Sequence, residues 1–235
     1  MQMTNDQLPL SIIIPVYNEE KVVESLLLQL SSLSVFEVIV VDGGSTDNTL
    51  EIAKKYNTQI IHSKISRRSY QMNIGAKRAN GAYLLFLHAD IVIPVSFKLA
   101  ISEAIDQQIQ LANFSLQFDW DHWFLKANAF FSRFRWNCFQ FGDQGLLIKY
   151  ALFENIGGFN EQLILAEGNE IIRRARKVSE FDKLSATLLV SARKYSKHGV
   201  IKLQLLYYFV YFLIRFRIKQ NVVLRVYWFF VNGGN

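Results

Sequence analysis

Residues 11–16 read SIIIPV, a run of β-branched side chains long enough for a strand that is buried on both faces of a sheet. Similar runs stand at 37–41 (EVIVV) and 83–87 (YLLFL), and a shorter one near 59–62. Apolar residues at helical spacing lie between them, and Asn18 is expected to cap the first helix. Strands that alternate with helices indicate a mostly parallel sheet covered on both faces, so the expected fold class is α/β. The helices are predicted at about 22–33, 49–56 and 70–79.

The second half of the chain has a different pattern. It contains a segment crowded with aromatic side chains and, beyond residue 200, an apolar tail interrupted by lysine and arginine. Such a tail predicts an amphipathic helical appendage. The expected organisation is one domain over 1–200 and a C-terminal helical segment over 201–235 that packs on the domain, on a partner or on a membrane surface. The other elements expected are helices at 95–108 and 170–178 and strands at 111–118, 145–148 and 187–190.

The composition is that of a folded protein, with 51% apolar and 20% charged residues in a chain of 235. A formal charge of +6 favours anionic partners without choosing among nucleotide phosphates, acidic lipids and nucleic acid. No recognised nucleic-acid-binding module is present, so no nucleic-acid partner is expected. The single cysteine, Cys138, excludes a disulfide within the chain. The polar opening MQMTNDQLPL lacks the apolar stretch of a signal peptide, so the expected location is the cytoplasm, with peripheral contact to the inner face of the cell membrane left open.

Three of the expected strands end in polar clusters that favour turns. They are PVYNE at 15–19, DGGSTD at 42–47 and HAD at 88–90. Because parallel strands end at the same edge of a sheet, the clusters are expected to face one crevice, where the ligands of such sheets bind. The Asp90 carboxylate is a hard oxygen ligand suited to Mg²⁺ or Mn²⁺ on a diphosphate, and His88 is a weaker metal candidate.

A pair of arginines, Arg67 and Arg68, precedes a predicted helix, and guanidinium groups beside a helix N-terminus can hold a diphosphate. Each of these features also has an explanation without a ligand. Glycines 43–44 fit a strand-to-helix turn in which Ser45 or Asp47 caps the next helix, HAD fits a polar strand exit, and two arginines fit a solvated basic pair. The convergence of the clusters favours a binding site.

Four segments, in order, resemble family 2 glycosyltransferases. They read SIIIPVYNEE, VVDGGSTDNT, RSYQMNIGAKRANGAYLLFLHAD and FGDQGLLIKYALFENIGGFNE, and the likeness runs from about residue 11 to 177 and more loosely into 191–199. They are most similar to a small bacterial subgroup whose metal motif reads His-Ala-Asp. The resemblance implies a GT-A-type, Rossmann-like fold. It also implies metal-dependent, inverting transfer of a sugar from a nucleoside-diphosphate sugar, with UDP as the expected nucleotide, to a sugar or lipid-linked acceptor.

The resemblance further implies roles for the matching residues. Asp42 would hold the base, and Arg68 would neutralise the diphosphate. Asp90, with His88 beside it, would coordinate Mg²⁺ or Mn²⁺. Asp143, in the acceptor-side loop, would contact the sugar or the acceptor. The full nucleotide-sugar-binding set implied is Pro15, Tyr17, Glu19, Asp42, Gly43, Arg68, Asn73 and Ala89.

One position departs from the family pattern. The family supplies its general base from a Glu-Asp pair that opens a late helix, whereas this chain reads Glu167-Gly168. Glycine cannot accept a proton, so the base is expected to be Glu167 or Asp143, with Glu170 as an ordinary capping or surface acid. Glu167 replaces the lost group only if the backbone there is not yet helical, because one step round a helix turns a side chain by roughly 100°. A weakened or non-catalytic nucleotide-sugar-binding relative is the alternative.

The aromatic segment 120–141 and the tail each fit more than one role. Aromatic stripes are commonly core, but the interleaved cations also suit an apolar acceptor or an amphipathic surface. The most apolar part of the tail, 203–214, is shorter than the roughly 20 residues needed to span a bilayer. A peripheral helix, a packing helix and a homo-oligomer contact are the alternatives there. A dinucleotide-dependent oxidoreductase is disfavoured, because no GxGxxG follows the first strand.

Overall fold

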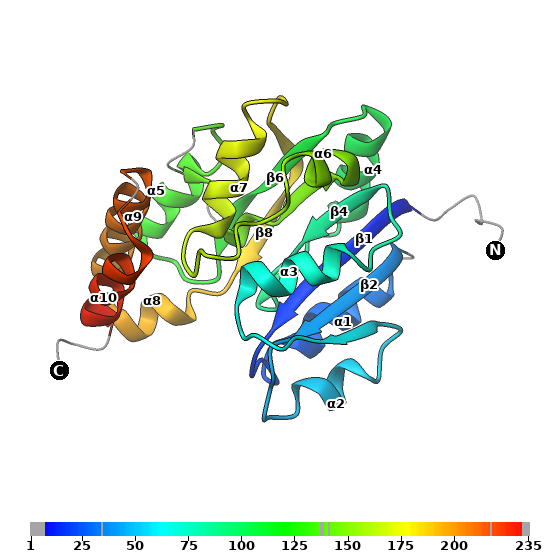
Figure 1. The fold of residues 1–235 in the computed structure, drawn as a ribbon, viewed down its shortest axis with the longest axis horizontal. Helices are drawn as coiled ribbons and strands as arrows, with labels where there is room; N and C mark the ends of the chain where they lie inside the picture. The colour runs from blue at the N-terminus through cyan, green and yellow to red at the C-terminus, as the bar shows by residue number, and fades with distance from the viewer. Residues whose placement is uncertain (1–7, 34, 137–138, 141, 217, 232–235) are drawn as a thin grey trace.

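The computed structural model describes residues 8–33, 35–136, 139–140, 142–216 and 218–231. These residues form one mixed sheet with helices on both faces (Figure 1), which confirms the α/β prediction. The strand order is β3-β2-β1-β4-β7-β6-β8-β5. Cys138 and the opening residues 1–7 lie outside the described part of the chain. The helices are α1 (Val23–Ser31), α2 (Thr49–Ala53), α3 (Arg68–Ala76), α4 (Phe97–Asp106), α5 (Trp123–Phe131), α6 (Tyr150–Asn155), α7 (Glu167–Ala175), α8 (Arg193–His198), α9 (Val200–Arg215) and α10 (Gln220–Val231).

The first four strands are parallel to one another. They are β1 (Leu8–Val16), β2 (Val35–Asp42), β3 (Gln59–His62) and β4 (Tyr83–Phe86). The register pairs Val16 of β1 with Asp42 of β2, and Asp42 with His62 of β3. The strands therefore end side by side, and the polar clusters that follow them start from one edge of the sheet.

The second half of the sheet contains strands of both directions. β7 (Leu146–Lys149) runs antiparallel to both β4 and β6 (Leu111–Phe118), while β8 (Asp182–Val190) is parallel to β6. The two-residue β5 (Ile91–Val92) pairs antiparallel with the end of β8. Since β7 runs against β4, the start of β7 lies beside the end of β4.

Successive residues of β1 enter two apolar layers on opposite faces of the sheet. Ile12 and Ile14 pack with residues of α1 and α4, whereas Ile13 packs with residues of α3, α6 and α7. Gly75 allows α3 to lie close to the sheet, because a Cβ at that position would stand 2.5 Å from Cγ2 of Ile13. Because both faces of β1 are buried, its sequence is a continuous apolar run rather than an alternation of apolar and polar residues.

The C-terminal segment forms two helices, α9 and α10, which pack against each other and beside α5 at the end of the molecule far from the N-terminus (Figure 1). Leu125, Leu203 and Val223 lie in the apolar cluster between them. Within the described ranges, no helix is long and apolar enough to cross a membrane. The predicted division of the chain at residue 200 stays a prediction.

The structure differs from the sequence predictions at several elements. α7 begins at Glu167 rather than at 170, because Ala166 takes the left-handed conformation (φ 58°) and lets the helix start one turn earlier. β8 begins at Asp182 rather than at 187, since its first residues already pair with β6. Asn18 does not cap α1: its side chain instead accepts a hydrogen bond from the backbone N–H of Thr46. The elements that sequence reasoning missed are β5, α5, α6 and α8.

Candidate functional site

A cavity of about 450 Å³ opens at the edge of the sheet where the parallel strands end. It brings together residues from the end of β1, the start of α3, the segment after β4, the loop before β7 and the start of α7. Helices α8, α9 and α10 supply much of the rest of its wall, together with residues of β6, α5 and the segment before α7. The sequence-predicted site residues that line it are Pro15, Tyr17, Glu19, Arg68, His88, Asp143 and Glu167.

Arg68 is the first residue of α3 and faces the first residue of α7 across the cavity. Its Nη1 lies 3.5 Å from Oε1 of Glu167, whose side chain is buried. Burial disfavours the guanidinium cation, but the carboxylates of Glu167, Asp143 and Asp90 outweigh burial and raise the pKa of Arg68. The guanidinium of Arg68, fixed beside Glu167, gives this end of the cavity a cation that a phosphate group can pair with.

Asp143 and His88 form a hydrogen-bonded pair in the same cavity, with His88 Nδ1 2.9 Å from Oδ1 of Asp143. His88 follows β4, and Asp143 lies in the short 3₁₀ helix Gly142–Gln144 that precedes β7. They meet because β7 is antiparallel to β4. Nδ1 of His88 is occupied by this bond, so only its Nε2 stays available to a metal ion.

The pKa of Asp143 predicts how stability depends on pH. Burial raises the pKa of this carboxyl, but the hydrogen bond from His88 and the positive charges of His88, Lys194 and Arg68 hold it well below its usual range. Below its ordinary pKa of 3.8 the unfolded chain binds a proton that the folded chain does not, so the stabilising contribution is lost as the pH falls. We expect the unfolding free energy of wild type to fall relative to that of Asp143→Asn below about pH 4. Urea unfolding from pH 7 to pH 3 measures this, and a constant difference between the two proteins would contradict it.

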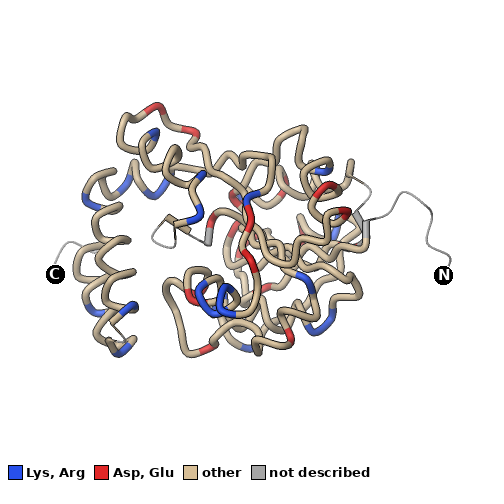
Figure 2. The backbone as a smooth tube through the Cα atoms, turned by 90° about the horizontal axis from the view of Figure 1, so that it is seen from above, with Lys and Arg blue, Asp and Glu red and all other residues tan. Residues whose placement is uncertain are grey.

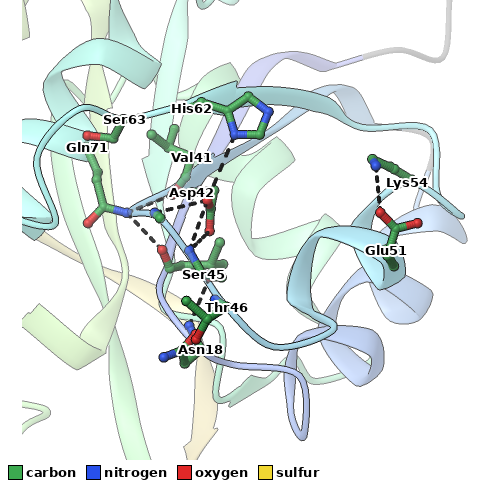
Figure 3. Close-up of polar contacts among 12 residues, drawn as sticks. Asn18, Val41, Asp42, Ser45, Thr46, Glu51, Lys54, His62, Ser63 and Gln71 are labelled. Carbon is green, nitrogen blue, oxygen red and sulfur yellow. Dashed lines mark hydrogen bonds and ion pairs between the residues drawn. The ribbon is translucent and has the colours of Figure 1, made fainter.

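Asp42 and Gly43 lie at the same sheet edge but are not among the described residues that line the cavity. The buried Asp42 carboxylate accepts hydrogen bonds from the backbone N–H groups of Gly44 and Ser45 (Figure 3). A Cβ on Gly43 would lie 3.1 Å from Nε2 of Gln71, a side chain that itself lines the cavity. The carboxylate organises the loop after β2, and its predicted contact with a nucleotide base stays a prediction.

Asp90 and Ala89 are also outside the described cavity lining. Ala89 packs its side chain in the apolar core. Asp90 is half-buried and lies 3.9 Å from Nη2 of Arg193, which stands 3.4 Å from Oε2 of Glu19 in the cavity wall. The described residues contain no group of three or more histidine, cysteine, aspartate or glutamate side chains that could hold a metal ion. A single carboxylate fits Mg²⁺ or Mn²⁺ when phosphates and water complete the coordination.

Asn73 lies further along α3 and is not among the described residues that line the cavity. Its side chain donates to the carbonyl of Phe159 and accepts from the N–H of the same residue, both within 2.9 Å. It also donates to Oε1 of Glu161 at 2.8 Å. The structure therefore places Asn73 as an anchor for the 159–161 loop.

Lys183 of β8, a half-buried lysine, holds the segment that carries Asp143. Its Nζ lies 2.7 Å from Oδ1 of Asn113 and 2.9 Å from the side-chain oxygens of both Gln140 and Gln144. Burial lowers the pKa of Lys183 to about 7. Asn113 lies on β6 and the two glutamines lie in the loop before β7, so no local sequence signal could reveal their meeting with Lys183.

Sequence reasoning also missed the part of the cavity wall that α8, α9 and α10 supply. Arg193 and Lys194 belong to the stretch SARKYSKHG, whose charge pattern was a usable signal, but its fold onto Glu19 and Asp143 was not predictable from spacing. The remaining missed residues are mostly aromatic: Tyr195, Gln204, Tyr207, Val210, Tyr211, Tyr227 and Trp228.

Comparison with known sequences places relatives over the first part of the chain. The family described as "Glycosyl transferase family 2" matches residues 11–147. The uncharacterized glycosyltransferase YibD of Escherichia coli K12 is 32% identical over 120 residues, which are 47% of this chain and 34% of the relative. The poly(ribitol-phosphate) β-N-acetylglucosaminyltransferase TarS of Staphylococcus aureus is 36% identical over 91 residues, 34% of this chain and 16% of TarS. The matched segments thus span about a third or less of these relatives.

Comparison with solved structures shows a shared fold over most of the chain. The structure of S. aureus TarS residues 1–349 has a TM-score of 0.64 and 21% identity, covering 84% of this chain and 65% of that one. The mannosyltransferase PcManGT of Pyrobaculum calidifontis, solved with GDP-Man and Mn²⁺, has a TM-score of 0.67 and 17% identity over 94% of this chain and 69% of its own. At these identities the likeness concerns the fold alone.

Proposed function

We propose that this chain, which belongs to glycosyltransferase family 2, transfers a sugar from a nucleoside-diphosphate sugar to an acceptor hydroxyl with inversion at the anomeric carbon. The observation that carries the proposal is the single cavity in which the end of β1, Arg68, Asp143 and Glu167 converge. An anionic diphosphate and a hydroxyl nucleophile need a cation and a carboxylate in one site, and this cavity contains both.

The donor end of the proposed site is built around Arg68. In the proposal, Pro15, Tyr17 and Glu19 line the nucleoside pocket and Asp42 holds the base. Nη1 of Arg68 lies 3.5 Å from Oε1 of Glu167. The diphosphate competes with this carboxylate for the guanidinium, which neutralises part of the diphosphate charge. Solved neighbours support a nucleotide sugar as ligand, since TarS was crystallised with UDP-GlcNAc and PcManGT with GDP-Man. We propose UDP as the nucleotide of this chain.

Asp90 is the proposed ligand for Mg²⁺ or Mn²⁺, with Nε2 of His88 as a second candidate. Magnesium is commonly held by one or two carboxylates together with substrate phosphates, and one half-buried carboxylate near the cavity meets that requirement. The bound ion would neutralise charge that develops on the departing diphosphate. Nη2 of Arg193 lies 3.9 Å from Oδ2 of Asp90, so this carboxylate stands beside a cation of α8.

We assign the general base to Asp143 rather than to Glu167. Glu167 is the first residue of α7, so its backbone is helical and its side chain does not point where an aspartate at position 168 would. Glu167 is also almost wholly buried against Arg68, whereas 44% of the Asp143 side chain is exposed. In the proposed step, the acceptor oxygen bonds to the anomeric carbon and its proton passes to Asp143. The bond from that carbon to the diphosphate oxygen breaks, and its electron pair leaves with the diphosphate.

A second candidate function is nucleotide-sugar binding without efficient turnover. Gly168 lines the cavity at the position where the family carries its base, and it supplies no proton acceptor. This candidate shares the donor site with the first and differs only in the chemical step.

Nucleotide binding tests the proposed function. We expect calorimetric titration of the whole chain with UDP to show binding when Mn²⁺ or Mg²⁺ is present and little binding with EDTA. GDP serves as the matched comparison for the choice of base. If neither UDP nor GDP binds in the presence of metal, the proposed function is wrong.

A panel of nucleotide sugars, scored for donor hydrolysis, separates the two candidates. If the chain is an active enzyme, the wild-type protein hydrolyses at least one donor at a measurable rate. A non-catalytic relative shows no turnover as wild type, and Gly168→Asp would raise its rate by about 10²–10⁴-fold, the usual contribution of a general base.

A further inference from the structure

One end of the cavity is lined by aromatic side chains of the C-terminal helices rather than by charges. The rings of Tyr207 and Tyr227 stack with centroids 6.5 Å apart and planes 18° apart. Tyr195 meets Tyr207 edge-on at 6.3 Å. Ring faces of this kind bind hydrocarbon and the apolar faces of sugars. The aromatic residues that α8, α9 and α10 contribute to the cavity lining are Tyr195, Tyr207, Tyr211, Tyr227 and Trp228.

Asp143 lines the same cavity as both the aromatic residues and Arg68. Burial is the main cause that raises the pKa of Tyr195 and Tyr207, and the nearby Asp143 carboxylate adds to it. Both phenols therefore stay neutral, and Tyr195 donates its hydroxyl proton to Oε1 of Gln204 at 2.6 Å. Asp143 lines the same cavity as these rings, so a molecule held by the rings shares that cavity with the proposed base.

Helix α9 contributes one side to the cavity and presents another to solvent. Gln204, Tyr207 and Tyr211 line the cavity. The outward side carries a row of apolar residues three or four positions apart, each between 46% and 63% exposed. Exposed apolar residues that gather on one side of a helix mark an interaction surface. Its members are Ile201, Leu205, Phe209, Phe212 and Phe216, which we call the outer row.

The charge around the outer row has one sign. Residues 193–231 contain eight lysines and arginines and not one aspartate or glutamate. Figure 2 shows this asymmetry: the helices near the C-terminus carry blue positions without red ones. Lys202 and Arg215 are exposed within the span of the row, and Lys219 follows it. Exposed aromatic residues flanked by cations complement an anionic lipid surface.

We propose that α9 lies on an anionic lipid surface through the outer row, and that the aromatic end of the cavity receives a lipid-borne alcohol as the acceptor. The inference rests on the proposed function and names its acceptor class: a hydroxyl group attached to a hydrocarbon chain. The hydrocarbon packs on the rings of Tyr207, Tyr227 and Trp228. The hydroxyl reaches Asp143, and the chain leaves the cavity along α9 toward the lipid.

Vesicle co-sedimentation with the full chain tests the surface. We expect at least about tenfold stronger binding to phosphatidylcholine vesicles that contain phosphatidylglycerol than to phosphatidylcholine alone. The double variant Phe209→Ser, Phe212→Ser should lose this binding. Its matched control is Leu28→Ser, Leu99→Ser, which removes two exposed leucines from α1 and α4 and should bind as wild type. Equal binding to both vesicles, or unchanged binding of the Phe209, Phe212 variant, would overturn the proposal.

Binding of a small amphiphile tests the aromatic subsite. We expect octyl glucoside, below its micelle concentration, to bind at least about tenfold more tightly than glucose, because its chain is buried against rings. Trp228→Ala should remove this advantage, while Trp123→Ala, which changes an exposed tryptophan of α5 outside the cavity, should keep it. Equal affinity for glucose and octyl glucoside would refute a hydrocarbon-bearing acceptor.

The two levels of proposal fail in different ways. If UDP does not bind in the presence of Mn²⁺, the proposed function is wrong. If UDP binds but neither vesicles nor octyl glucoside show the expected preferences, the donor site stands and only the lipid-borne acceptor is wrong.

Discussion

Replacement of Asp143 by asparagine is expected to lower kcat for sugar transfer by about 10²–10⁴-fold, the usual contribution of a general base. The amide keeps an oxygen that accepts the hydrogen bond from His88 Nδ1, so the 2.9 Å contact and the loop can persist. What is lost is the capacity to take a proton from the acceptor. The measurement is kcat under saturating donor and acceptor, with the Kd for UDP in parallel. We expect that Kd to change little, because Asp143 is not part of the proposed donor pocket.

Two variants on α7 show whether this loss is specific. Glu167→Gln removes the carboxylate beside Arg68, and we expect it to change kcat by less than about tenfold and to leave UDP binding no weaker, since a competitor for the guanidinium is gone. Glu170→Gln is the matched control one turn further on, where the side chain is held by Arg174 at 2.8 Å and does not line the cavity. If Glu167→Gln caused the large loss and Asp143→Asn the small one, our assignment of the base would be reversed.

Replacement of Asp90 by asparagine is expected to abolish the metal dependence of nucleotide binding. A neutral amide is a much weaker ligand for Mg²⁺ or Mn²⁺ than a carboxylate, and phosphate charge would stay uncompensated. Metal ions contribute several kcal/mol of transition-state stabilisation, so kcat/KM should fall by about 10²–10⁴-fold. Calorimetric titration with UDP at a series of Mn²⁺ concentrations measures the first effect, and initial rates measure the second.

The control for the Asp90 variant is Asp106→Asn, which removes an exposed carboxylate at the end of α4 and should leave both measurements unchanged. His88→Ala separates the two metal candidates, because a second ligand would weaken Mn²⁺ binding without eliminating it. Wild-type behaviour of Asp90→Asn, with UDP binding still dependent on Mn²⁺, would show that the ion is held elsewhere.

The N-terminal half of the fold could be predicted because its signals are local. The run SIIIPV forms the end of β1, and its apolar side chains on both faces match a parallel sheet covered by α1 and α3. Parallel order alone then places the ends of β1, β2 and β4 at one edge, and the cavity lies there. Tyr17 and His88 were found in this way, whereas Arg68 was predicted from its place beside the start of a helix.

The pairing of His88 with Asp143 could not be predicted, because it depends on the direction of β7. Nothing in the residues of β7 distinguishes an antiparallel strand from a parallel one. The contacts of the Asp42 side chain could not be predicted either, because the same residue types fit a ligand contact and a turn. In the structure the carboxylate makes the turn contacts. For α7, the start depends on the left-handed backbone of Ala166, a conformation that alanine rarely adopts.

The aromatic end of the cavity was hidden for a different reason. The tail reads as apolar residues with scattered cations, and such a pattern does not say which side of the helix meets the protein. Only the packing of Leu203 and Val210 against the rest of the chain turns Tyr207 inward and Phe209 outward. Prediction from sequence could name an amphipathic segment there, but not its contribution to a ligand site.

On the ribosome, the site cannot be complete before β7 has been synthesised, because Asp143 lies directly before that strand. The pairings β1 with β2, β1 with β4 and β2 with β3 involve residues up to 86 only. These four strands can therefore pair once residue 86 has emerged. The outer edge of β4 then stays open until β7 is synthesised and pairs with it. An unpaired edge in a nascent chain is a template for wrong pairing with a neighbouring polypeptide. The arrival of β7 closes that edge and, in the same event, brings the carboxylate of Asp143 to the imidazole of His88.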